Sequence, residues 1–105
     1  MIKVTYYIGM NDKDVLQQIY KKEYFINEFD EVFRDYTILE AQSVHTMQNN
    51  GIIIKENTFI LTTFVDDCEE IQLRKLIQAN RNALKNRLNQ ESILVEVTEP
   101  GVIFC

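Results

Sequence analysis

The sequence predicts an α+β sandwich, in which two helices cover one face of a four-stranded antiparallel sheet. Three observations support this prediction. Apolar and polar residues alternate in residues 2–8 and 92–98, as in half-buried strands, and two further strand-like runs lie between them. Apolar residues recur with a helical period in two further segments. An Asn50-Gly51 pair, a strong hairpin signal, lies between the two middle strands. The order is strand, helix, strand, turn, strand, helix, strand.

The first half of the chain contains a strand and a helix. Residues 2–8 alternate apolar and polar side chains, which predicts a strand with one buried face. Residues 22–35 place Phe25, Phe29 and Phe33 on one side of a helix. The start of this helix has two alternatives: it begins at Val15 after an Asp14 cap, or an irregular stretch runs to about residue 21.

The centre of the chain is a predicted hairpin of residues 37–47 and 52–65. A type I′ turn at Asn50-Gly51 makes the numbers of opposed residues sum to 101, so that His45 faces Glu56. The sequence leaves open which of two sets of hairpin residues lies on the helix-free face of the sheet. They are Ile60 and Phe64 in one, and Phe59 and Leu61 in the other.

The second half repeats the pattern of the first. Acidic residues 66–70 favour a helix start, the helix extends to about Asn89, and residues 92–98 alternate as a last strand. Two β-α-β halves with right-handed crossovers give the strand order 4-1-3-2, a ferredoxin-like sandwich. We expect one domain, residues 1–105, that ends in a short apolar tail at residues 102–105.

Composition limits the class of protein. The chain has 105 residues, 46% hydrophobic residues and a net charge of −5, enough for one core without disulfides. Apolar runs are too short to cross a bilayer, and the first residues lack a signal-peptide pattern, so we expect a cytoplasmic protein without membrane association. Cys68 and Cys105 share no metal or redox spacing, and we expect neither a metal nor a cofactor.

Residues for catalysis are few, which favours a non-catalytic protein without catalytic residues. The sequence has one histidine, no glycine-rich phosphate loop, and a cysteine, Cys68, among acids that oppose thiolate formation. The alternative is a dimeric ligand-binding protein or enzyme with a pocket around His45, Glu56 and Tyr7, where a carboxylate would orient the imidazole.

Charge is distributed unevenly. Arg74, Arg81 and Lys85 form a basic stripe on the second helix. Opposite charges on the first helix, at Glu23, Asp30, Glu31 and Asp35, favour pairing of the two helices over binding of nucleic acid. The acidic patch that could bind a partner consists of Asp30, Glu31, Asp66, Asp67, Glu69 and Glu70.

The helix-free face of the sheet is the strongest candidate for partner binding. Thr5 and Tyr7 from the first strand and Glu96 from the last project there, beside apolar residues of the hairpin. An apolar patch of this kind typically marks an interface. With Val102 and Phe104 of the tail, this face predicts protein binding and a homodimer. A third alternative is an RNA-binding module that uses Tyr7 and the basic stripe.

Three short segments resemble small βαββαβ proteins of phages and mobile elements. They are the opening Tyr7-Ile8-Gly9-Met10-Asn11-Asp12-Lys13-Asp14 (YIGxNDKD), the tripeptide Glu56-Asn57-Thr58 and the stretch Asn89–Glu96 (NQESILVE). The resemblance assigns no catalytic residue. It implies a small, phage-borne accessory protein. We expect such a protein to bind and inhibit a bacterial protein, such as a defence complex, through the open sheet face and the acidic patch, whose carboxylates would imitate phosphates.

Overall fold

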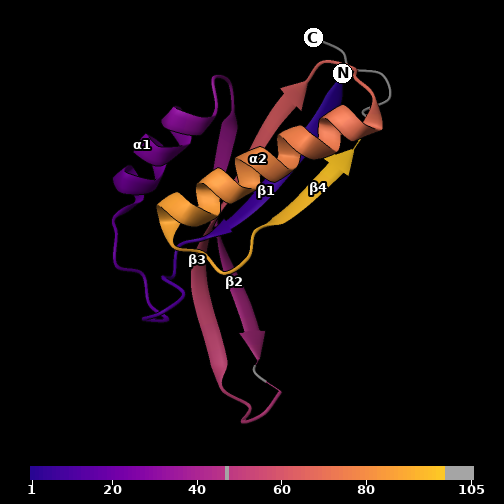
Figure 1. The fold of residues 1–105 in the computed structure, drawn as a ribbon. Helices are drawn as coiled ribbons and strands as arrows, with labels where there is room; N and C mark the ends of the chain where they lie inside the picture. Colours follow the sequence, from indigo (N-terminus) through magenta and orange to yellow (C-terminus); the bar gives the residue numbers. More distant parts are fainter. Residues whose placement is uncertain (47, 99–105) are drawn as a thin grey trace.

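The structure, a computed structural model, describes residues 1–46 and 48–98. Its elements are β1 (Ile2–Gly9), α1 (Lys22–Val32), β2 (Thr37–Thr46), β3 (Ile53–Val65), α2 (Glu70–Leu88) and β4 (Leu94–Thr98). The strands form one antiparallel sheet in the order β2-β3-β1-β4, and the helices cover one face of it (Figure 1). The predicted ferredoxin-like sandwich and its strand order are confirmed.

The core lies between this sheet face and the two helices. Alternate residues of β1, from Ile2 to Ile8, are at most 4% exposed. In β3, Phe59 packs against the rings of Phe25 and Phe29 of α1, with centroid distances of 6.1 and 5.4 Å. Burial of these large apolar side chains is the main stabilising contribution to such a small domain.

The register resolves which hairpin residues face away from the helices. Tyr7 of β1 pairs with Ile60 and Leu94, and Lys3 pairs with Phe64. Because neighbouring residues across strands share a face, Ile60 and Phe64 lie with Tyr7 on the helix-free face.

The predicted pairing of the hairpin is wrong by two residues. His45 pairs with Ile54, and Ser43 pairs with Glu56, so opposed numbers sum to 99. A type I′ turn needs positive φ at both central residues, but only Gly51 has it, with φ 69°. The side chain of Asn50 instead accepts a hydrogen bond from the amide of Ile52. A shift of two leaves every residue on its predicted face.

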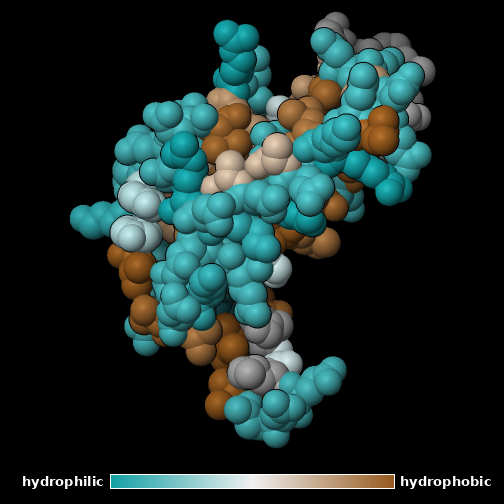
Figure 2. Space-filling view, in the orientation of Figure 1, coloured by the Kyte–Doolittle hydropathy of each residue, from teal (hydrophilic) through white to brown (hydrophobic). Residues whose placement is uncertain are grey.

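The hairpin of β2 and β3 extends beyond the helices (Figure 1). Residues 53–57 of β3 pair with β2 alone, residues 58–62 pair with both β2 and β1, and residues 63–65 pair with β1 alone. Val44, Ile52 and Ile53 are exposed on this extension, and hydrophobic residues are visible along it in Figure 2.

Several predicted ends of elements are corrected. Helix α1 begins at Lys22, after an irregular stretch, as the second of the two alternatives predicts, but it ends at Val32 rather than at residue 35. Phe33 adopts an extended backbone, so it reaches the core from outside the helix and prolongs the apolar pattern. Strand β4 begins at Leu94, two residues later than predicted. Within the described ranges, neither helix is long and apolar enough to span a membrane.

Candidate functional site

A pocket of about 330 Å³ lies where β1 ends, next to the helix-free face. Three segments form it: the loop after β1, the extension of β3, and the connection from α2 to β4. Its lining residues are Asn11, Asp12, Lys13, Leu16, Ile54, Glu56, Gln90, Glu91 and Ser92. We call it the Glu56 pocket. The three segments that resemble phage proteins in sequence converge here.

Glu56 is held across the end of β1. Its Oε2 accepts a hydrogen bond of 2.9 Å from the amide of Asn11, and the side chain is half-buried. The carboxyl group passes so close to Gly9 that a Cβ atom at that position would overlap it. Glycine is therefore needed at position 9 for the close approach of Glu56, not for an unusual backbone angle.

Gly9→Ala tests this packing. Because the overlapping atoms are at the free end of Glu56, we expect the substitution to displace the carboxylate and break its bond to Asn11. The expected loss of stability is about 1.5–3 kcal/mol, the usual value for a hydrogen bond to a charged group. Chemical denaturation measures it. In a Glu56→Ala background the same Gly9→Ala change should cost almost nothing; an equal cost in both backgrounds would contradict the contact.

Asp12 organises the loop after β1. Its Oδ1 accepts hydrogen bonds from the amides of Asp14, at 2.8 Å, and Val15, at 3.0 Å. Its Oδ2 accepts one of 2.8 Å from the side-chain amide of Asn89. These bonds, with that from Asn89 contributing most, lower the pKa of Asp12 below its ordinary value of 3.8. Asp12 is therefore an anion, although only 7% of its surface is exposed.

The lowered pKa predicts a pH dependence of stability. A carboxyl group whose pKa is lower in the folded state stabilises the fold above its unfolded pKa, and this contribution is lost as pH falls through the folded pKa. We expect the melting temperature to fall below about pH 4 in the wild type. Asp12→Asn should be less stable at pH 7 and show a flatter profile below pH 4. Parallel profiles for the two proteins would contradict a role for Asp12.

The end of α2 is joined to this loop. Asn89 adopts a left-handed backbone, with φ 49°, and ends the helix. The Nε2 atom of the buried Gln90 donates a hydrogen bond of 2.6 Å to the carbonyl of Asn11. Sequence reasoning did not single out Asp12, Asn89 or Gln90. Their presence in two of the segments quoted for the resemblance was the available signal.

The Glu56 pocket is negatively charged. Asp12, Glu56 and Glu91 line it, against one cation, Lys13. Among the described side chains, no cationic group lies within ion-pair distance of Glu56. Such a pocket favours a positively charged ligand. In the part of the chain that the structure describes, no group of three or more His, Cys, Asp or Glu side chains is placed to hold a metal.

The predicted pocket around His45, Glu56 and Tyr7 is only partly reproduced. Glu56 lines a pocket, but the predicted pairing of His45 with Glu56 is wrong, since Ser43 opposes Glu56. The side chain of His45 lies outside the described residues. Tyr7 lies on the same sheet face, further along β1, and does not line the Glu56 pocket.

The residues predicted for partner binding lie on one face but are not equally accessible. Glu96 is exposed and Tyr7 is half-buried, whereas Thr5 is buried between its neighbours. Val102 and Phe104 lie outside the described residues. The basic stripe is on α2, on the opposite side of the sandwich from Tyr7, so no single RNA-binding surface combines them.

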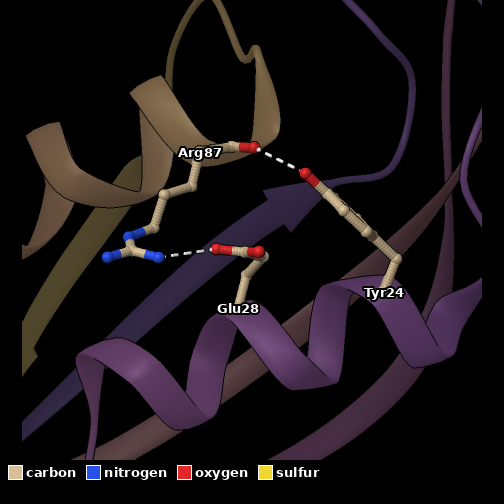
Figure 3. Close-up of polar contacts among 3 residues, drawn as sticks. All are labelled: Tyr24, Glu28 and Arg87. Carbon is tan, nitrogen blue, oxygen red and sulfur yellow. Dashed lines mark hydrogen bonds and ion pairs between the residues drawn. The ribbon is translucent and has the colours of Figure 1, made fainter.

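The two helices are joined by an ion pair, but not between the residues that the sequence predicts. The ion pair that joins α1 and α2 is between Glu28 and Arg87, at 2.8 Å, beside a hydrogen bond from the hydroxyl of Tyr24 to the carbonyl of Arg87 (Figure 3). In the basic stripe, Arg74 pairs instead with Glu70 of its own helix.

The acidic patch is divided between two places and partly engaged. Asp30 of α1 accepts a hydrogen bond from the hydroxyl of Tyr36. Burial of the ring, together with this bond, raises the pKa of Tyr36 to about 12. Asp67, before α2, pairs with the N-terminal amine of Met1. The other acidic residues of the patch, Glu31, Asp66, Glu69 and Glu70, are exposed.

Comparison with known proteins places the fold. No family model and no curated protein matches the sequence. A phage SAM lyase in complex with S-methyl-5'-thioadenosine is similar in structure, with a TM-score of 0.66 and 21% identity over 93% of this chain and 80% of the lyase. The same lyase without ligand gives 0.65 and 20%, over 92% and 78%.

A second similar structure is the divalent ion tolerance protein CutA1 from Ehrlichia chaffeensis. The TM-score is 0.51 at 14% identity, over 98% of this chain and 84% of CutA1. At these identities, the similarities show a shared fold. The first two structures are of a phage protein.

Proposed function

We propose that the protein binds an S-adenosyl sulfonium compound, of the class that a SAM lyase acts on, in the Glu56 pocket. The observation that supports this most is the carboxylate of Glu56, which is fixed by Asn11 and Gly9 and has no cationic partner among the described side chains. The similarity to a phage SAM lyase supports the choice of ligand class.

The chemistry of the pocket fits such a ligand. A sulfonium and an ammonium group both carry positive charge, and three carboxylates line the pocket. Ile54 and Leu16 add apolar surface for the groups attached to sulfur. Its size, about 330 Å³, is at the lower end for small-molecule sites.

Thermal shift with two ligands tests the proposal. We expect S-adenosylmethionine and S-methyl-5'-thioadenosine to raise the melting temperature by about 10 °C at a hundredfold excess over Kd. Adenosine, which lacks the sulfur, is the comparison. Chromatography of the incubated S-adenosylmethionine then shows whether S-methyl-5'-thioadenosine is released. No shift with either sulfur compound at millimolar concentration would contradict the proposal.

The helix-free face supports a second, non-catalytic candidate: binding of a second copy of the chain. Leu39, Phe64 and Leu94 are 63%, 50% and 68% exposed on this face. Lys3 and Glu96 face the same way, one on β1 and one on β4, without ion pairs among the described side chains. In a two-fold dimer each Lys3 would meet Glu96 of the second copy, and such an interface is self-complementary.

Charge exchange tests the dimer. Lys3→Glu and Glu96→Lys should each shift the protein toward monomer in light scattering, and the double exchange should restore the dimer. A monomeric wild type would exclude this candidate. A dimer that none of the variants affects would place the interface elsewhere.

The exposed acids support a different non-catalytic use, inhibition of a bacterial defence protein whose nucleic-acid groove they would occupy. Binding would then weaken steeply as salt rises, because screening acts on exposed charges. Neutralising Asp30, Glu31, Glu69 and Glu70 together should abolish it. A complex that tolerates these changes would contradict the imitation of phosphates.

A further inference from the structure

Leu16 has a backbone conformation that leucine rarely adopts. Its φ is 61°, in the left-handed region, where a side chain with a Cβ is crowded. The residue is also 70% exposed, so burial of its side chain within this chain does not offset the strain. Strained residues of this kind persist only where the surrounding structure fixes them, and they concentrate at functional sites.

Hydrogen bonds on both sides of Leu16 fix it. The amide of Leu16 donates to the carbonyl of Asp12, and the amide of Asp12 donates to the carbonyl of Gln17, both at 2.8 Å. One residue further, Oε1 of Gln18 accepts a bond of 2.9 Å from the side chain of Asn57 in β3. The loop is therefore tied to itself and to the sheet, and Leu16 cannot relax without breaking these bonds.

The strained residue Leu16 lines the same pocket as the carboxylate of Glu56, to which we assign binding of the ligand. Leu16 lines the Glu56 pocket, where Ile54 provides apolar surface from the hairpin. It also lines a second depression, with Gln42 and Lys55. An exposed leucine at the rim of an acidic pocket offers an apolar contact next to a site for positive charge.

We propose that Leu16 is a specificity-determining residue, which contacts the apolar group attached to the sulfur of the ligand. This inference rests on the proposed function of the Glu56 pocket. It adds a mechanism of selection: the carboxylates attract the charge, and Leu16 distinguishes an alkylated sulfur from a polar group such as a hydroxyl. The loss of one apolar contact typically weakens binding about tenfold or more.

Calorimetry of Leu16→Gly and Leu16→Asn tests the inference. Both residues accept a positive φ, so the loop should keep its shape and the melting temperature should stay equal or rise. We expect Kd for S-methyl-5'-thioadenosine and S-adenosylmethionine to rise about tenfold in both variants. The weaker binding of adenosine should not change. Val15→Ala, an exposed neighbour that does not line the pocket, should leave all three affinities unchanged.

The possible failures are distinguishable. If the wild type binds the sulfur compounds and both Leu16 variants bind them equally well, the role of Leu16 is refuted and the proposed function stands. If the wild type binds neither compound, the proposed function is refuted, and the inference with it. Equal weakening for adenosine would show that Leu16 shapes the pocket without selecting for sulfur.

Discussion

Glu56→Gln is expected to weaken the binding of S-adenosylmethionine by at least about thirtyfold, or about 2 kcal/mol. Glutamine has nearly the same shape, and its carbonyl oxygen can still accept the bond from the amide of Asn11. The substitution therefore removes the charge and leaves the geometry. S-methyl-5'-thioadenosine has no charge on sulfur, so its affinity should change far less.

Titration calorimetry of both ligands measures this difference. Glu96→Gln is the matched control, because it removes one negative charge from the same sheet face outside the pocket. It should leave both affinities within about twofold. Equal losses for the two ligands in Glu56→Gln would show that Glu56 supports the pocket without recognising charge. No loss for either ligand would remove Glu56 from the site.

Phe59→Ala is expected to lower the free energy of unfolding by about 3–5 kcal/mol. Phe59 is 0% exposed and its ring packs against Phe25 and Phe29, where the sheet meets α1. Truncation leaves a cavity that the neighbouring rings cannot fill. Small domains are typically stable by about 5–15 kcal/mol, so this loss is a large fraction of the total.

Phe64→Ala is the control for this experiment. Phe64 lies on the same strand, but on the helix-free face, and is 50% exposed. Its truncation should cost less than about 1 kcal/mol in the isolated chain. Urea denaturation of both variants gives the comparison. Similar losses at both positions would contradict the assignment of the core face of β3, and with it the register of the sheet.

The sequence was sufficient for the fold because the hydrophobic pattern is clear in both types of element. In β1, Val4, Tyr6 and Ile8 alternate with polar neighbours, and each is buried. In α1, Phe25 and Phe29 are four residues apart and both contact the sheet side. Burial of these side chains decides the topology, and burial is what the pattern encodes.

Exact pairing in the hairpin could not be obtained in the same way. The Asn50-Gly51 signal predicts a two-residue turn, but six residues separate the last paired positions, Thr46 and Ile53. Packing of Phe59 and Leu61 in the core fixes the buried face of β3, and both the predicted and the observed pairing satisfy it. The alternation of faces was correct because a shift of two residues preserves it.

The candidate site could be predicted only in part, since it depends on contacts between distant segments. Glu56 was named as a pocket residue, but with His45 as its partner. The structure instead gives it the amide of Asn11, 45 positions away. Asp12 and Asn89 are 77 positions apart, and no local pattern indicates that they meet. Polar networks of this kind leave no periodic signal in a sequence.

Chemical-shift mapping with S-adenosylmethionine tests the central claim most directly. Amide spectra of the ¹⁵N-labelled protein should show saturable shifts at Gly9, Asn11, Leu16 and Glu56, which surround the pocket. The amides of the α2 stripe, at Arg74, Arg81 and Lys85, should not move. Shifts confined to α2 or to the far end of the helix-free face, with none at Asn11 and Glu56, would contradict a ligand site in the Glu56 pocket.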